Sequence, residues 1–216
     1  VYHRAGIKIT RAAGETSVID STEAGGDVRW TENELHDSME LHWSAFANRA
    51  QWKMWIFLAE LGKLDRWGND TLGGMMFDGH IDEPGGVDRQ GTAIFTLCPH
   101  FHTAGGDYCQ ANPPAAEAAQ RELFFDLVHE SGHAFNLYHS FSKTFDPGGV
   151  GIPHFPWDAP PWMPVTDRVQ ALSWINYPDA ATADASPESP IHSAQWFYER
   201  FEFRFDDNDN LFLRHA

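Results

Sequence analysis

The spacing of hydrophobic and polar positions predicts several short strands in the first half of the chain. Residues 6–12, "GIKITRA", alternate between apolar and polar side chains, as expected for a half-buried strand. Short apolar runs bounded by glycine and polar residues predict three more strands, within 51–60, 72–79 and 91–98.

Two longer segments have helical signals. In 31–50, Thr31 is followed by Glu34 in the arrangement of a capping box, and apolar residues then recur at helical spacing. The segment 111–135 has prolines at its expected first turn, followed by Ala, Glu, Gln and Leu, all good helix formers. Near the C-terminus, 193–205 is interpreted as a helix that passes into a strand.

The pattern changes after residue 139. Residues 143–168 contain six of the thirteen prolines and three glycines, and they have little periodicity. We see no internal repeat and no long linker. One domain of two unequal lobes, 1–139 and 140–216, is the simplest organisation.

Composition narrows the classes of protein. The 216 residues are 42% hydrophobic, with nine Trp and sixteen Phe, so the chain can bury a substantial core. Acidic residues outnumber basic ones by 31 to 15, which argues against binding nucleic acid or anionic membrane through a basic face. The apolar runs are too short for a membrane span. The chain begins at Val1 without a signal peptide, as expected of a mature or trimmed form.

The two cysteines, Cys98 and Cys109, flank a loop that contains glycine. A disulfide between them would stabilise the fold by about 3 kcal/mol in the chain-entropy model and would indicate an oxidising compartment. The alternative is two reduced thiols that lie near each other.

The most informative segment is "HESGHAFNLYH", residues 129–139. His129 and His133 are four positions apart, so on a helix their imidazoles stack on one face and can share a metal ion. Glu130 is rotated by about 100° from His129, which keeps it out of the ligand set but within reach of a water on the metal.

His139 would point away from the other two histidines if the helix continued. A helix that stops near Asn136, a residue that tolerates the left-handed conformation of helix ends, lets the chain return His139 as a third ligand. Three neutral nitrogens leave one position for water, the pattern of a catalytic zinc site. The alternative is three histidines that are packed in the core or exposed.

This segment resembles the H-E-x-x-H-x-x-G-x-x-H signature of the metzincin zinc endopeptidases. It departs at Asn136, where most members have glycine. The family also has a methionine turn, often Ser-x-Met-x-Tyr, and "SWINY", Ser173 to Tyr177, is similar but has Ile175 in place of the methionine. Asn136 and Ile175 are therefore expected to be structural supports of the site.

The resemblance implies an α+β, two-lobed zincin fold. The upper lobe, 1–139, would contain a twisted mixed sheet and two long helices and would end in the zinc helix. The irregular lower lobe, 140–216, would contain the turn and a C-terminal helix. The whole chain, 1–216, would form a single catalytic domain.

The resemblance also implies a zinc-dependent endopeptidase. Zn²⁺ would be held by His129, His133 and His139, and Glu130 would activate a zinc-bound water and then protonate the leaving amine. Tyr177 would ligate zinc in the resting enzyme and stabilise the oxyanion, or it would simply anchor the turn.

The partner would be a protein or peptide in an extended conformation, paired with an edge strand formed by 91–97 unless that strand is internal. Secretion is implied, and a propeptide or additional domains can accompany such a domain.

Two further hypotheses stay open. The same helix serves other zinc hydrolases such as an amidase or a gluzincin, which takes its third ligand from a later glutamate. A zinc-stabilised binding or adhesion module without catalysis is the other. Three features outside the motif are interpreted without a function. His100 and His102 are taken as loop residues, and "DDNDN" (206–210) as a solvated acidic turn and not a calcium loop. The glycosylation sequon at Asn69 is taken as a chance match.

Overall fold

The computed structural model describes residues 1–12, 18–47, 49, 51–63, 72–77, 90–98, 101, 115–135, 137, 139, 172–176, 197–198 and 200–215, with the backbone alone at 115–119, 208, 211–212 and 215. These residues form a mixture of α-helix and β-sheet, as predicted. The chain divides into two compact units, Thr10–Asn136 and Val1–Ile9 with Leu137–Ala216. The assignment of 1–216 to one catalytic domain stays a prediction.

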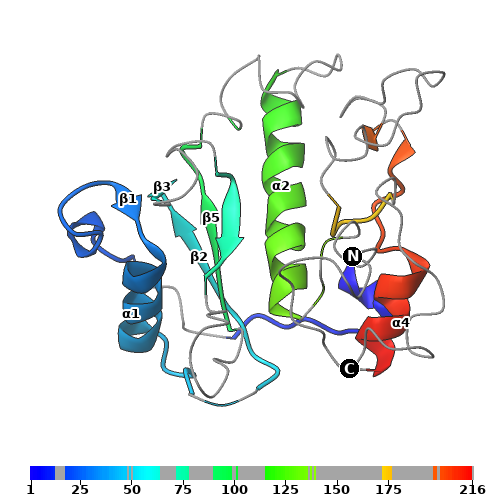
Figure 1. Cartoon of the computed structure of the whole chain (residues 1–216), viewed down its shortest axis with the longest axis horizontal. Helices are drawn as coiled ribbons and strands as arrows, with labels where there is room; N and C mark the ends of the chain where they lie inside the picture. Colours follow the sequence, from blue (N-terminus) through cyan, green and yellow to red (C-terminus); the bar gives the residue numbers. More distant parts are fainter. Residues whose placement is uncertain are drawn as a thin grey trace, which may run out of the picture. The chain divides into compact units, whose positions relative to one another are not determined.

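The unit Thr10–Asn136 contains a three-stranded sheet in the order β2 (Trp55–Ala59), β5 (Gly91–Phe95), β4 (Gly74–Met76). β5 is parallel to β2 and antiparallel to β4 (Figure 1). These are the three strands predicted from the apolar runs. Two shorter strands, β1 (Arg29–Trp30) and β3 (Leu61–Gly62), form a separate parallel pair.

The prediction that 91–97 forms an edge strand is wrong. β5 is the central strand of its sheet, and all five of its residues are buried. Every position in "GTAIF" is small, apolar or a β-branched threonine, which suits a strand covered on both faces. Among the described strands, β4 and β2 take the two ends of the sheet.

Helices cover the sheet on both faces. α1 (Glu32–His42) begins with the predicted capping box, in which the Thr31 hydroxyl accepts from the Glu34 N–H and the Glu34 carboxylate accepts from the Thr31 N–H. α2 (Ala115–Ala134) packs against β4 and β5 on the face opposite α1 (Figure 1). A short 3₁₀ helix, η2 (Ser21–Glu23), precedes β1. The core contains Ala24, Trp30, Leu35, Met39, Trp43, Ala59, Met75, Phe77, Ala93, Ile94, Phe95, Cys98 and Phe101.

The second unit includes a 3₁₀ helix, η1 (Tyr2–Ala5), and a C-terminal helix, α4 (Asp207–His215). The Tyr2 and Phe205 rings lie 5.2 Å apart. The predicted strand at 6–12 is wrong, since these residues have no regular structure and Gly6, in the left-handed conformation, ends η1. No described strand pairs with this segment, so its alternating pattern has no sheet to join.

The prediction for 193–205 is correct only in part. Residues 197, 198 and 200 are helical, but 201–206 do not form the expected strand. Their aromatic side chains pack around a turn instead: the Trp174 ring lies 4.7 Å from Phe201, and Phe201 stacks 5.0 Å from Phe197.

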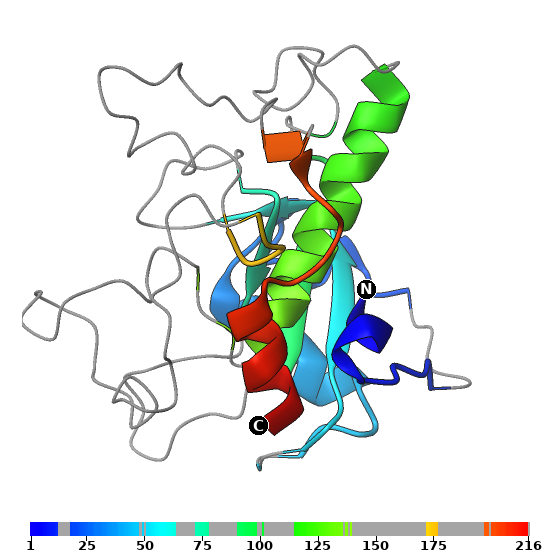
Figure 2. The same ribbon diagram turned by 90° about the vertical axis from the view of Figure 1, so that its right-hand side faces the viewer.

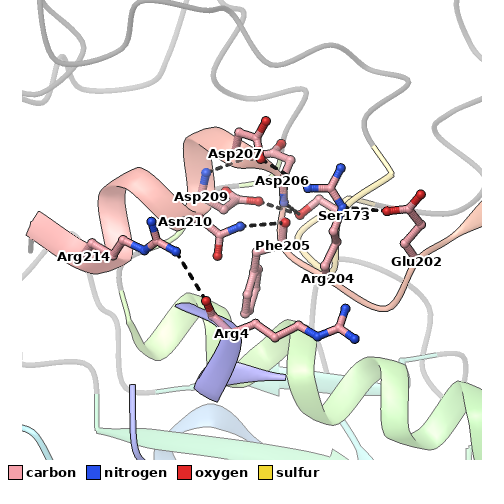
Figure 3. A network of polar contacts seen from close by, with 10 residues as sticks. All are labelled: Arg4, Ser173, Glu202, Arg204, Phe205, Asp206, Asp207, Asp209, Asn210 and Arg214. Carbon is pink, nitrogen blue, oxygen red and sulfur yellow. Dashed lines mark hydrogen bonds and ion pairs between the residues drawn. The ribbon is translucent and has the colours of Figure 1, made fainter. Parts of the chain in front are cut away.

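The acidic run 206–210 begins α4 and is not a solvated turn. Asp206 caps the helix, because its Oδ1 accepts from the Asp209 N–H at 2.8 Å. Asp209 is fully buried and accepts from the Ser173 hydroxyl at 2.5 Å (Figure 3). The Ser173 oxygen also accepts from the Asp206 N–H at 3.3 Å. These bonds join the turn 172–176 to the start of α4, which lie side by side in Figure 2.

We expect Ser173→Ala to lower the free energy of unfolding by about 2 kcal/mol, because it removes a donor from a buried carboxylate. Urea denaturation measures this. Arg204→Ala is the control: its ion pairs with Glu202 and Asp207 are exposed, so the change should stay within about 0.5 kcal/mol. Equal effects of the two substitutions would contradict a structural role of the Ser173–Asp209 bond.

Candidate metal centre

The end of α2 determines how the three histidines can meet. The helix ends at Ala134, and the Phe135 N–H still donates to the carbonyls of Ser131 and Gly132. The predicted end of the helix between His133 and His139 is therefore confirmed. Asn136 lies outside the described residues, so its left-handed conformation stays a prediction.

The three histidines form a group that can hold a metal ion. One ring nitrogen from each of His129, His133 and His139 can be chosen so that all lie within 4.8 Å of one another. The Nε2 atoms of His129 and His133 are 3.1 Å apart. Two nitrogens bound tetrahedrally to one zinc at its usual distances would be separated by about 3.3 Å. The donor set thus fits Zn²⁺, although nitrogen ligands also suit other transition metals.

The three rings differ in burial. His129 is buried, whereas His133 and His139 are half-buried. The Phe125 ring packs 5.9 Å from the His129 ring, one helical turn earlier on α2.

Glu130 lies on the side of α2 that faces the sheet. Its backbone carbonyl accepts from the Thr92 hydroxyl of β5 at 3.4 Å, and its Cγ atom lies 2.8 Å from the place of a Cβ atom on Gly74 of β4. The pKa of Glu130 is raised to about 8, mainly by burial and in part by the nearby Asp126 carboxylate, while the Met76 N–H acts in the opposite direction. A cation on the histidines would lower this pKa, since it favours the charged carboxylate.

Sequence reasoning missed Asp126, which lies one turn before Glu130 on the same helix. Its Oδ2 occupies the space in which a side chain at Gly73 would lie, and burial raises its pKa to about 7. The sequence contains a sign that Asp126 has a special role. An aspartate within the apolar run "LFFDLV" is unusual, and this one lies four positions before Glu130, at helical spacing.

The Asp126 carboxyl predicts a change of stability with pH. Its pKa is 3.8 in the unfolded chain and about 7 in the fold, so between these values the fold holds a proton that the unfolded chain releases. Its contribution to stability therefore falls as the pH rises through this range. In metal-free protein, the melting temperature of Asp126→Asn should rise relative to wild type between about pH 5 and pH 8. Parallel pH profiles of the two proteins would contradict this.

The structure describes only some of the remaining predicted residues. Ile175 is fully buried within the turn 172–176, and its N–H donates to the Ser173 hydroxyl. Cys98 is buried. The other predicted positions lie outside the described residues: Asn69, His100, His102, Cys109 and Tyr177. The disulfide and the role of the tyrosine stay predictions.

In the described part of the chain, no helix is long and apolar enough to cross a membrane.

Comparisons of the chain with protein-family models, curated proteins and solved structures found no match. The functional interpretation therefore depends on the motif and on the geometry of the group His129, His133 and His139.

Proposed function

We propose that the protein is a zinc-dependent endopeptidase of the metzincin type. The observation that carries the proposal is the convergence of three imidazole nitrogens on one group. Glu130 follows His129 directly in the sequence of α2. A three-nitrogen site leaves a position for water, whereas a structural zinc site usually has four protein ligands.

Zinc, Glu130 and Tyr177 have separate roles in the proposed hydrolysis. Bound zinc supplies a water of lowered pKa and a positive charge that polarises the scissile carbonyl. Glu130 takes a proton from the attacking water and delivers it to the nitrogen of the leaving amine. Gly74 on β4 leaves the space that the Glu130 side chain occupies. Tyr177 is proposed as an additional donor to the oxyanion.

Substrate binding is proposed at β4 instead of β5. Gly73 and Phe77 use their backbone groups to pair with β5, so the backbone groups of Gly74 and Met76 point away from that neighbour. An extended peptide can add to this side of β4 as another strand, with affinity from main-chain hydrogen bonds. β4 also packs against α2, which carries Glu130. Secretion and a Cys98–Cys109 disulfide belong to the same proposal.

Incubation of the zinc-loaded chain with a reduced, alkylated and therefore unfolded protein tests the proposal. Mass spectrometry should find internal cleavage products with new amino termini. A chelator should abolish the cleavage, and added zinc should restore it. Cleavage that survives complete removal of metal would contradict the proposed mechanism.

A further inference from the structure

The approach of β4 to α2 is unusually close at Gly74. A Cβ atom placed on Gly74 would lie 2.8 Å from Cγ of Glu130, 2.9 Å from Cδ1 of Ile94 and 3.1 Å from the Ala93 carbonyl oxygen. The first two distances are shorter than carbon atoms tolerate without contact strain. Any side chain at this position would therefore have to displace a neighbour.

Strand register explains why Glu130 is the neighbour. Gly74 is paired with Ile94 and Met76 with Thr92, and in a strand such alternate positions share one face. The Thr92 hydroxyl donates to the Glu130 carbonyl, so this face is the one toward α2. The absence of a side chain at Gly74 creates the space that the Glu130 side chain occupies.

The same strand also places a backbone N–H near this side chain. Met76 does not use its N–H in the ladder with β5, and this N–H acts on the Glu130 carboxylate so as to lower its pKa. The methylene groups of the Glu130 side chain are limited by the backbone at Gly74. This close approach restricts the rotamers open to the side chain.

We infer that β4 positions Glu130, with Gly74 as the residue that admits its side chain. The importance of this position of Glu130 for catalysis rests on the proposed function. Its structural content, a Glu130 rotamer set by β4, can be measured without zinc or substrate.

The first test measures the NMR chemical shift of the Met76 amide proton in metal-free protein. The chain has five methionines, so selective ¹⁵N-methionine labelling gives a simple NMR spectrum, which substitution of each methionine assigns. Glu130→Ala should shift the Met76 amide proton, because this N–H lies close to the Glu130 carboxyl group. Gly74→Ala should shift it in the same direction, because the added methyl group displaces the Glu130 side chain.

Gly91→Ala is the matched control. A Cβ atom on Gly91 would lie 2.3 Å from the Phe77 ring and 3.0 Å from the Met39 sulfur, so the substitution crowds the opposite face of the sheet. It should lower the melting temperature and leave the Met76 amide signal close to its position in wild type. A Met76 amide that is unchanged in both Glu130→Ala and Gly74→Ala would overturn the inference.

The second test is kinetic. In zinc-loaded protein, Gly74→Ala should lower kcat by about 100-fold with KM and zinc affinity unchanged, because a small misplacement of the catalytic group has effects of this order. Gly91→Ala should retain the kcat of wild type below its melting temperature. The fall in kcat could instead come from crowding of Ile94 by the added methyl group. In that case the double variant Gly74→Ala/Ile94→Val would restore kcat, since valine lacks the Cδ1 atom. We expect no recovery. If Gly74→Ala does not fold, the double variant replaces it in both tests, because it carries the same added methyl group at position 74 with less crowding of residue 94.

The two tests separate the inference from the proposed function. A wild type that never hydrolyses peptides, with the expected Met76 shifts, would overturn the proposed function and leave the positioning by β4 in place. A wild type that hydrolyses peptides, with full kcat in Gly74→Ala, would overturn the positioning alone.

Discussion

His139→Ala is expected to weaken zinc binding by more than about 100-fold, because loss of a direct ligand should exceed the 10–100-fold effect of losing an outer partner. His139 contributes one of the three nitrogens that converge within 4.8 Å. Without it, the two histidines of α2 would have to hold the ion with water in the remaining positions. Competition with a chromophoric chelator measures the dissociation constant.

His36→Ala is the control for this measurement, since His36 lies on α1 and pairs with Glu40. It should not change the zinc affinity. The comparison also decides between two classes of zinc hydrolase, because a gluzincin takes its third ligand from a glutamate. Zinc binding that is equally tight in His139→Ala and wild type would contradict the three-histidine site and favour that alternative.

Glu130→Gln is expected to lower kcat/KM for peptide hydrolysis by about 10³-fold or more, within the range observed for loss of a general base. Glutamine has nearly the same shape, but its amide cannot take a proton from water. Zinc affinity should remain close to that of wild type, because Glu130 is not among the three ligands. Steady-state kinetics on zinc-loaded protein, with the metal content measured in each sample, test this.

Glu40→Gln on α1 is the corresponding control and should retain the activity of wild type. Its carboxylate lies at the protein surface, paired with His36. Full hydrolytic activity in Glu130→Gln would exclude Glu130 as the proton acceptor. Loss of zinc from Glu130→Gln would instead mean that this residue supports the metal directly.

The metal centre could be predicted in part because its key features are local. His129 and His133 are fixed by the geometry of one helical turn, and the short distance along the chain to His139 limits where a third ligand can lie. The structure confirms the end of the helix at Ala134. The capping box of Thr31 and Glu34 is equally local and was predicted correctly.

The features that were missed depend on contacts between distant segments. The order β2-β5-β4 is decided by pairing of strands from different parts of the chain, so the sequence of β5 alone could not show that it is central. The packing of Gly73 and Gly74 against Asp126 and Glu130 likewise joins segments about fifty residues apart.

The acidic run 206–210 shows the same limitation. Its high charge suggested exposure to solvent, but Asp209 is buried because Ser173, far away in the sequence, donates to its carboxylate. A buried charge becomes acceptable only when such a partner is present, and the partner is invisible in the local pattern.

The most direct test of the central claim is a zinc titration of metal-free protein in which bound zinc and peptide hydrolysis are measured in the same samples. We expect hydrolysis to rise in proportion to bound zinc and to stop rising at about one equivalent per chain, when the open three-histidine site is filled. Tight binding of one equivalent without any hydrolysis of unfolded protein or peptides would contradict the proposed peptidase activity and indicate a zinc-stabilised binding module.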